Sequence, residues 1–346
     1  MNPIPHLPFM QRCLTLAAKA LGNTYPNPLV GAVVVHQNKI IGEGWHQKAG
    51  EAHAEVHALN QVKDPSLLPE STLYVNLEPC SHVGKTPPCA DFICKYGIKK
   101  VVVASRDPNP LVAGQGIAKL KKAGVEVIES ILTQEAEFLN RRFYTFHQKK
   151  RPYIVLKWAQ THDGFIAPLQ KEAAQPFWIS NALAKQRVHQ WRSEEASILV
   201  GAQTVVDDNP ELTTREWPGH NPLRLILDPS GRVPKDAKVL TDAYPSVLFH
   251  SKNQKSNYSS VKEQVVLNPF NLEKLMEYCY EKQLLSLIVE GGQKTLQSFI
   301  DLNLWDEARV FTASTTLGQG VKAPLLQKKP QREEKIKDNL LQTYFR

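Results

Sequence analysis

Two histidines four residues apart, with a glutamate between them, occupy the stretch HAEVHAL at residues 53–59. A metalloprotease helix carries His-Glu-x-x-His, in which the glutamate directly follows the first histidine. Here Ala54 separates His53 from Glu55, so the glutamate would face a different direction, and His57 is most simply an ordinary histidine on a helix surface. The zinc deaminases instead use His-x-Glu, followed downstream by Pro-Cys and a second cysteine.

The downstream part of the deaminase pattern is present in LEPCSHVGKTPPC, which contains Cys80 and ends at Cys89. One imidazole, from His53, and two thiolates leave the fourth tetrahedral position of zinc for water. Zinc brings the pKa of that water toward neutrality. Glu55, which is not a ligand in this arrangement, would carry a proton from the water to the leaving amine. The sequence therefore predicts a zinc-dependent hydrolytic deaminase with Glu55 as its catalytic residue.

Alternating strands and helices are expected to position these residues. The hydrophobic pattern predicts a hairpin at 30–45, a helix at 53–62, a strand at 72–78, a helix at 89–97, and a strand, helix and strand between 99 and 130. His53 and Cys89 would then each open a helix, where the helix dipole lowers the pKa of a thiol. The alternation is typical of a three-layer α/β domain.

The chain as a whole fits a globular protein with two domains. It has 346 residues, 42% of them hydrophobic and 22% charged, which is long for a single core. No apolar run approaches the ~18 residues of a membrane span, and the first residues lack the pattern of a secretory signal. Five cysteines do not make a disulfide framework in a chain of this length, so we expect a reducing cytoplasm. The net charge of +8 permits anionic small molecules or nucleic acid as partners.

A second α/β series follows the polar, proline-terminated segment HQKKRP at 147–152, which predicts a linker between domains at 1–147 and 148–346. Strands are expected at 153–159, 196–202, 223–228, 246–250, 285–290 and 307–313, helices at 181–192 and 291–301, and an exposed loop at 251–260.

Two glycine motifs could bind a dinucleotide. GQGIAK at 114–119 has the first two glycines of the dinucleotide fingerprint but lacks the third. IVEGGQKTL places Glu290 and two glycines between a strand and a helix. The helix N-terminus would favour a pyrophosphate, although a plain tight turn also explains this pattern.

Longer stretches resemble the bifunctional deaminase/reductase family of riboflavin biosynthesis. They are YPNPLVGAVVV, GWHQKAGEAHAEVHAL, LEPCSHVGKTPPC and DPNPLVAGQGI in the first half, and RPYIVLKWAQTHDGFIA, VGAQTVVDDNPELTTR, LRLILD and IVEGG in the second. The eight residues between Cys80 and Cys89 are similar to the pattern of this family, whereas most other zinc deaminases have two. The resemblance implies an N-terminal cytidine-deaminase-like domain and a C-terminal dihydrofolate-reductase-like domain that uses NADPH.

The resemblance also implies the reactions and the residues that serve them. It implies deamination of 2,5-diamino-6-(5-phosphoribosylamino)pyrimidin-4(3H)-one, then reduction of the ribosyl chain to give 5-amino-6-(5-phosphoribitylamino)uracil. In the deaminase, Asn27 matches a substrate contact, and the positions near the pocket are His46, Gly50, His82 and Lys85. In the reductase, the positions that match NADP contacts are Ala159, Trp178, Thr204, Asp208 and Gly292. Those that match contacts to the ribosyl phosphate substrate are Pro176, Arg192, Leu212, Arg215 and Glu290.

Chemistry supports part of this assignment. Arg192 and Arg215 could fork a phosphate. Lys157 and Asp163 are candidates for polarity or proton delivery, although Asp163 followed by Gly164 equally fits a turn. 

The sequence departs from the family at three places. His162 stands where an aliphatic residue is usual, and Pro176 replaces a small polar residue. The C-terminal segment KIKDNLLQTYFR is short, so a trimmed terminal strand is expected, and the resemblance covers roughly residues 8 to 320.

Two other classes compete with the bifunctional enzyme. A deaminase of a nucleic acid base, such as a tRNA adenosine deaminase, would share the zinc motif, but the long segment between the cysteines and the reductase-like half disfavour it. A non-catalytic zinc module is disfavoured because a structural site has no use for Glu55 beside an open coordination position. We therefore expect one zinc per chain, a small-molecule substrate, no nucleic-acid or membrane partner, and a homo-oligomer, either dimer or tetramer.

Overall fold

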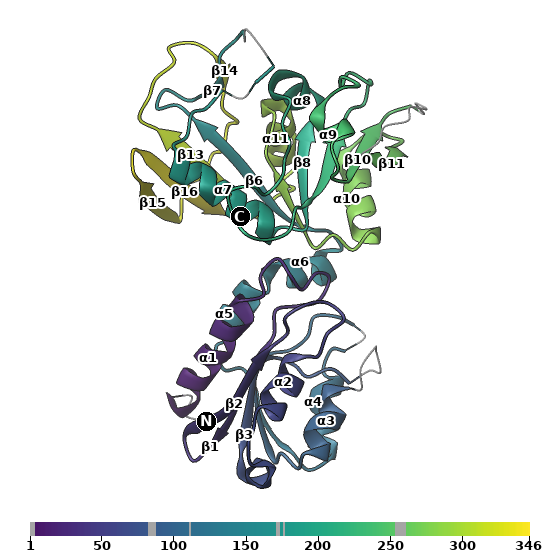
Figure 1. Cartoon of the computed structure of the whole chain (residues 1–346), viewed down its shortest axis with the longest axis vertical. Coiled ribbons are helices and arrows are strands. Elements are labelled where there is room, and N and C mark those ends of the chain that lie inside the picture. Colours follow the sequence, from purple (N-terminus) through teal and green to yellow (C-terminus); the bar gives the residue numbers. More distant parts are fainter. Residues whose placement is uncertain (1–3, 82–87, 111, 171–173, 176, 253–260) are drawn as a thin grey trace. The chain divides into compact units, whose positions relative to one another are not determined.

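Two compact units make up the chain, Met1–Lys150 and Arg151–Arg346 (Figure 1). The computed structural model describes residues 4–81, 88–110, 112–170, 174–175, 177–252 and 261–346. The expected linker at 147–152 is partly helical, since the last turn of α6 (Arg141–Lys149) reaches Lys149. Phe143, Tyr144 and Phe146 of this helix are buried. The domain limits expected from the sequence, 1–147 and 148–346, remain predictions.

The first unit is built on a five-stranded sheet with the order β2-β1-β3-β4-β5. Its strands are β1 (Gly31–His36), β2 (Lys39–Trp45), β3 (Thr72–Leu77), β4 (Lys100–Ser105) and β5 (Glu126–Ile128). The β1–β2 hairpin turns at Gln37 and Asn38, which both have positive φ, as the predicted two-residue turn requires. β3, β4 and β5 are parallel, so their C-terminal ends lie at the same edge of the sheet.

Helices cover both faces of this sheet, as expected for three layers (Figure 1). α2 (Ala54–Asn60), α3 (Cys89–Lys95) and α4 (Gln115–Lys122) pack against the face that carries Ala32, Val34 and Val75. α1 (Leu7–Ala18) and α5 (Thr133–Leu139) pack against the face of Val33, Val35 and Tyr74. The alternation of neighbouring β1 residues between the two cores follows the two-residue period of a strand.

The second unit contains a nine-stranded sheet with the order β11-β10-β9-β8-β12-β6-β13-β16-β15. Its strands are β6 (Tyr153–Gln160), β8 (Ser197–Gly201), β9 (Leu223–Leu227), β10 (Ser246–His250), β11 (Val261–Val266), β12 (Ser286–Val289), β13 (Glu307–Ala313), β15 (Arg332–Ile336) and β16 (Asn339–Phe345). The strands from β11 to β13 are parallel, and β13, β16 and β15 pair antiparallel. β7 (Phe165–Ala167) and β14 (Val321–Lys322) form a separate small sheet.

The helices of this unit divide between the two faces of the large sheet. α7 (Ala182–Glu194), α8 (Ala202–Asp208) and α9 (Lys238–Thr241) bury residues in one core. α10 (Leu272–Glu281) and α11 (Gln293–Asp301) bury residues in the other. α7 starts where the sequence predicts, because the Asn181 side chain accepts a hydrogen bond from the Ala184 amide at 2.9 Å and caps the helix.

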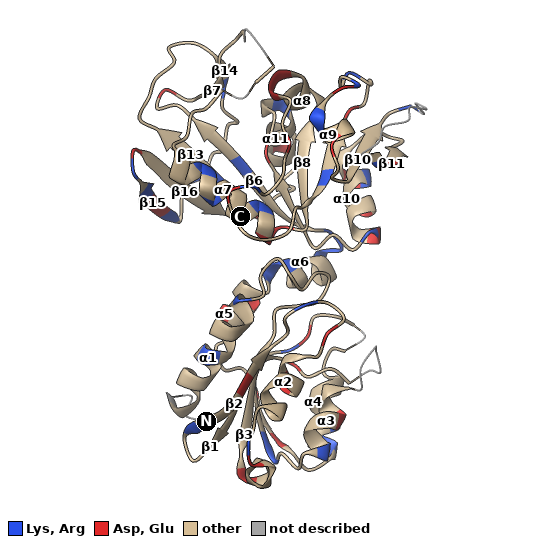
Figure 2. Ribbon diagram, in the orientation of Figure 1, with Lys and Arg blue, Asp and Glu red and all other residues tan. Residues whose placement is uncertain are grey.

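The expected loss of a terminal strand is wrong. β16 pairs with β13 over its whole length, from Phe345 opposite Glu307 to Asn339 opposite Ala313. The signal was weak because β15, REEKI, is exposed at four of five positions, as suits a charged edge strand. Figure 2 shows acidic and basic residues mixed along β15.

Two further expectations concern the loop at 251–260 and membrane spans. The loop expected at 251–260 lies mostly outside the described residues, which omit 253–260. Among the described residues, no helix has the length and apolarity that crossing a bilayer requires.

Candidate functional sites

The three predicted metal ligands lie together beyond the C-terminal end of β3. Nδ1 of His53 is 3.2 Å from Sγ of Cys89 and 3.6 Å from Sγ of Cys80. All three ligand atoms lie within 4.8 Å of one another, and no other such group of histidine, cysteine or acidic residues occurs among the described residues. One nitrogen and two sulfurs form a donor set that suits zinc and leaves a coordination position open.

The two cysteines have opposite pKa shifts because they share a hydrogen bond. The side chain of Cys89 and that of His53 lower the pKa of Cys80 to about 4, against the effect of burial. The same interaction with Cys80, together with burial, raises the pKa of Cys89 well above its ordinary value. The backbone amide of Cys89 also donates to Sγ of Cys80 over 3.3 Å, so the start of α3 stabilises a thiolate at Cys80.

Glu55 lies on the first turn of α2 and is buried. Burial raises its pKa above the ordinary value, although the nearby His53 opposes that shift. His57 is not part of the ligand group. It is half-buried rather than on the surface, because it packs closely against Gly44 of β2, where an added Cβ would collide with the Cβ of His57.

Asn27 and His46 adjoin the ligand group. The His46 ring lies edge-on to the His53 ring, with centroids 5.4 Å apart. Nδ1 of His46 is 3.1 Å from the carbonyl oxygen of Ala52, and Nε2 is 3.0 Å from Nδ2 of Asn27. A carbonyl only accepts, so Nδ1 carries the proton and Nε2 accepts from the Asn27 amide. Among the other expected pocket positions, Gly50 has a φ of 89°, and His82 and Lys85 lie outside the described residues.

Two buried amides that the sequence analysis did not single out fix the segment that follows Asn27. Asn76 accepts from the Gly31 amide at 2.7 Å and donates to the Leu29 carbonyl at 3.0 Å. Asn140 binds the amide and the carbonyl of Leu29 at 2.8 and 2.9 Å. The one available signal was an asparagine within the otherwise apolar strand TLYVNL.

In the second unit, Glu290, Arg192 and Lys157 form a partly buried ionic cluster. Nε and Nη2 of Arg192 donate to the two carboxylate oxygens of Glu290 at 2.7 and 2.8 Å. Nζ of Lys157 lies 3.5 Å from Oε2 of Glu290. The strand register explains the proximity, because Val289 of β12 pairs with Leu156 of β6, which brings the next residues, Glu290 and Lys157, side by side.

Arg192 and Arg215 both reach Thr213. Nη1 of Arg192 donates to the Thr213 carbonyl at 3.1 Å, and Nη1 of Arg215 donates to the Thr213 hydroxyl at 2.8 Å. His189 on α7 accepts from the Arg215 amide at 3.1 Å. Burial, with the nearby arginines, lowers the pKa of His189 to about 4, so a neutral ring holds this loop. The expected contact Leu212 precedes Thr213 with a φ of 58° and is buried.

The two glycines after β12 lie between α8 and α11. Gly291 accepts a hydrogen bond from the Gly201 amide at 3.0 Å. A Cβ at Gly291 or Gly292 would lie 3.4 or 3.2 Å from the Thr204 hydroxyl, and one at Gly201 would lie 2.6 Å from the Thr295 hydroxyl. Gly292 is the N-cap of the nine-residue helix α11. Backbone amides and hydroxyl groups therefore gather at a helix N-terminus, as anion binding requires.

The remaining expected NADP positions are more dispersed. Ala159 is half-buried on β6, and Asp208 is the last residue of α8. Trp178 is 59% exposed, with Nζ of Lys185 4.6 Å from its ring centroid. The expected substrate contact Pro176 lies outside the described residues. The GQGIAK motif lies in the first unit and starts α4.

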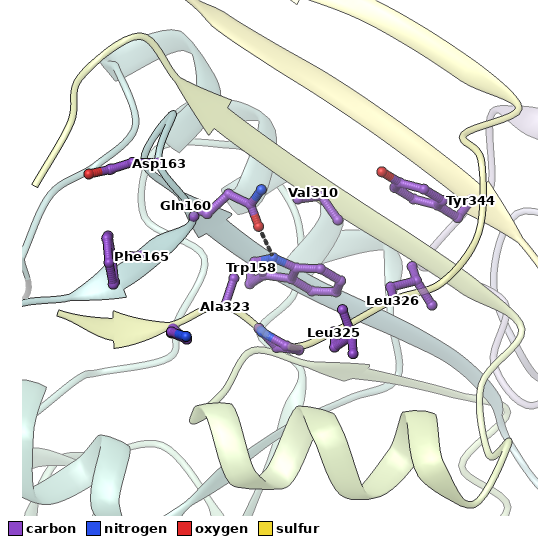
Figure 3. Close-up of a pocket in the computed structure, with 12 residues that line it drawn as sticks. Trp158, Gln160, Asp163, Phe165, Val310, Ala323, Leu325, Leu326 and Tyr344 are labelled. Carbon is purple, nitrogen blue, oxygen red and sulfur yellow. Dashed lines mark hydrogen bonds between the residues drawn. The ribbon is translucent and has the colours of Figure 1, made fainter. Parts of the chain in front are cut away.

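Asp163 does not join the ionic cluster. Its carboxylate accepts from the Gly318 amide at 2.7 Å and from the Thr161 hydroxyl at 2.6 Å, which fits the turn rather than proton delivery. Asp163 is among the residues that line a hollow of about 330 Å³. Figure 3 shows these residues, with Trp158 donating to Gln160. Trp158 and Gln160 alternate along β6 with Lys157 and therefore face the opposite side of the sheet.

Comparison with known proteins identifies both halves. Residues 4–105 match the cytidine and deoxycytidylate deaminase zinc-binding region, and residues 152–345 match the RibD C-terminal domain. The protein thus combines a cytidine-deaminase-like domain with a dihydrofolate-reductase-like domain, as predicted.

Whole-chain similarity defines the family. The riboflavin biosynthesis protein RibD of Aquifex aeolicus is 44% identical over 319 residues, which cover 90% of this chain and 88% of that protein. RibD of Escherichia coli is 34% identical over 327 residues, covering 90% and 88%. The crystal structure of a diaminohydroxyphosphoribosylaminopyrimidine deaminase/5-amino-6-(5-phosphoribosylamino)uracil reductase from Thermotoga maritima is 36% identical, with a TM-score of 0.89 and 99% of each chain covered. A structure of Acinetobacter baumannii RibD is 34% identical, with a TM-score of 0.90 and the same coverage.

The chain therefore belongs to the RibD family, whose members join a deaminase to a reductase in riboflavin biosynthesis. The match of the second half to a reductase domain removes the nucleic-acid deaminase and the non-catalytic zinc module as interpretations of the whole chain.

The ionic cluster of Glu290, Arg192 and Lys157 predicts an acid-sensitive stability of the second unit. Burial alone would raise the pKa of Glu290, but Arg192 and Lys157 outweigh it and lower the pKa to about 2. A depressed carboxyl pKa contributes stability above the unfolded value and loses it as pH falls through the folded value. A shift from 4.5 to about 2 corresponds to about 3 kcal/mol.

We therefore expect the free energy of unfolding of the wild-type protein to approach that of Glu290→Gln as pH falls from 5 toward 2. Urea unfolding at several pH values measures both. A difference between the two proteins that stays constant over this range would show that Glu290 is not a charged partner of Arg192.

Proposed function

We propose that this chain deaminates 2,5-diamino-6-(5-phosphoribosylamino)pyrimidin-4(3H)-one at its pyrimidine 2-amino group and then reduces the ribosyl chain with NADPH. The observation that carries the proposal is the group of His53, Cys80 and Cys89 beside a buried glutamate, in a chain whose other unit carries the ionic cluster and the glycine turn. The Thermotoga maritima neighbour bears the names of both activities.

In the deaminase, His53, Cys80 and Cys89 would hold one zinc ion per chain. Zinc at such a site supplies the Lewis acidity that activates water. Glu55 would accept a proton from that water and return it to the leaving amine, and its raised pKa suits both steps. Asn27, whose amide nitrogen is taken by His46, would present its carbonyl oxygen to an N–H group of the pyrimidine.

In the reductase, the amides that follow Gly292 at the start of α11 and the Thr204 hydroxyl would hold the pyrophosphate of NADPH. Ala159, Trp178 and Asp208 would complete the cofactor site. The nicotinamide supplies a hydride, and C1 of the opened ribose, as an imine or aldehyde, would receive it.

The substrate phosphate of the reductase would bind at the Thr213 loop. The Nε edge of Arg192 is occupied by Glu290, so Arg192 would offer only its other edge. Arg215, which is partly exposed, would be the main phosphate contact. Burial lowers the pKa of Lys157, which favours this side chain over Asp163 for proton delivery to the substrate.

Two broader expectations stay proposals. All five cysteines are free thiols, which supports a cytoplasmic location. Assembly into a dimer or tetramer is expected for a family member and remains a prediction.

The zinc ligands can be tested by metal analysis. Cys80→Ser should lose most of its zinc, because it removes a thiolate ligand. Cys94→Ser is the control, since Cys94 is half-buried on α3 and is not part of the ligand group. It should keep one zinc per chain. Equal zinc loss from both variants would sink the assignment.

The role of Glu55 can be separated from metal binding. Glu55→Gln should keep its zinc and bind the substrate. It should release ammonia ~10² to 10⁴ times more slowly than the wild type, because it lacks the group that transfers protons. A rate of ammonia release near that of the wild type would exclude Glu55 as the proton carrier.

The two sites should fail independently. Arg215→Ala removes a charge-assisted contact to phosphate worth roughly 1.5 to 3 kcal/mol, which is about ten- to a hundredfold in KM at the reductase. Ammonia release by the same protein should stay near the wild-type rate. If Arg215→Ala abolishes ammonia release while the protein stays folded and zinc-loaded, a single composite site must replace the two-site account.

A further inference from the structure

We propose that Glu78 is a positioning residue of the deaminase, which fastens Asp107 and the start of α4 (residues 114–117) to the Pro79–Cys80 turn and thereby fixes the Cys80 thiolate. The inference rests on the proposed function, because it takes Cys80 as a zinc ligand. It also gives a role to DPNPLVAGQGI, which the proposed chemistry does not otherwise use.

The buried carboxylate of Glu78 accepts hydrogen bonds from three backbone amides of this segment. Oε2 accepts from Gly114 at 2.9 Å and from Asp107 at 3.3 Å. Oε1 accepts from Ile117 at 3.1 Å. Gly114 is the N-cap of α4, so the negative charge lies at the positive end of that helix. The side chain thus joins both ends of the segment to β3.

A close backbone approach shows how tightly the start of α4 packs against the Pro79–Cys80 turn. A Cβ at Gly116 would collide with the carbonyl oxygen of Pro79. The backbone amide of Glu78 also donates to the Ser105 carbonyl at 3.0 Å, which continues the β3–β4 pairing. Pro79 is therefore enclosed between β4 and the start of α4.

Cys80 is held from its other side by α3. Its carbonyl accepts from the Ala90 amide at 3.1 Å, and its sulfur accepts from the Cys89 amide at 3.3 Å. If the Glu78 clamp opened, the Pro79 side of the turn could shift while the α3 side stayed in place. The Cys80 sulfur would then point in a different direction, although it would still be present as a ligand.

A carboxylate suits this position better than an amide of the same size. Three N–H groups converge on the two oxygens, and both oxygens of a carboxylate accept. In Glu78→Gln, the amide nitrogen would replace one accepting oxygen and meet at least one N–H donor. Among the residues that the structure describes, no lysine or arginine forms an ion pair with Glu78, so backbone amides are its partners.

The test compares Glu78→Gln with Glu129→Gln. Glu129 pairs with Arg106 and Lys121, which flank the same segment, so its variant also removes a carboxylate beside the segment but does not touch the Pro79–Cys80 turn. Three readouts are needed: ammonia release, visible absorption of the cobalt(II)-substituted protein, and reduction of the deaminated intermediate supplied directly. The cobalt–thiolate bands report the geometry of the two thiolate ligands, Cys80 and Cys89, which a general loss of stability would not alter in the folded protein.

We expect Glu78→Gln to lower kcat for ammonia release roughly ten- to a hundredfold, as is typical for residues that orient metal ligands. Its cobalt–thiolate bands should shift, and its reductase activity should stay unchanged. Glu129→Gln should match the wild type in all three readouts. A folded Glu78→Gln with the wild-type kcat and cobalt spectrum would overturn the inference, as would equal effects of both variants.

If Glu78→Gln does not fold, the same three readouts are measured on Glu78→Asp. It keeps the charge but shortens the reach, so we expect a smaller loss of kcat with a cobalt shift, and wild-type values would overturn the inference. The proposed function fails separately, if the wild-type protein holds zinc but releases no ammonia from the diaminopyrimidine.

Discussion

Both sites depend on the same constraint, that parallel strands end together at one edge of a sheet. In the first unit, β3 and β4 end at Leu77 and Ser105, which are paired in register, and the chain continues into the Cys80 turn. In the second unit, β12 ends at Val289 opposite Leu156 of β6. Residues that are far apart in the sequence are thereby brought within hydrogen-bonding distance.

Burial sets the chemistry at each of these edges in a different way. Around Cys80, the side chain of Cys89 and the amide at the start of α3 favour a thiolate, while burial raises the pKa of the neighbouring Glu55. Around Glu290, two cations outweigh burial and keep the carboxylate charged. The first edge is thus suited to hold a cation and move protons. The second, with one more cation than anion in its cluster, is suited to an anionic substrate.

The sequence predicted most strands and the grouping of His53, Cys80 and Cys89 because those signals are local. The spacing of His53, Cys80 and Cys89 and the apolar runs needed no tertiary information. The clamp at Glu78 and the amides of Asn76 and Asn140 were not predicted, because their partners are backbone groups 29 to 111 residues away. β15 was missed because an exposed edge strand of mostly charged residues, REEKI, has no apolar alternation. Asp163 was ambiguous between a turn and a catalytic role until the hydrogen bonds of Thr161 with Asp163 and Gly164 showed the turn.

The most direct test of the two-site account is chelation. Protein that has been treated with a zinc chelator should fail to oxidise NADPH when it is given the diaminopyrimidine phosphate, because no deaminated intermediate forms. The same sample should still oxidise NADPH when the deaminated intermediate is supplied, and added zinc should restore the first reaction. If chelation stops reduction of the supplied intermediate in a folded protein, or leaves NADPH oxidation with the diaminopyrimidine intact, the account of two independent sites is contradicted.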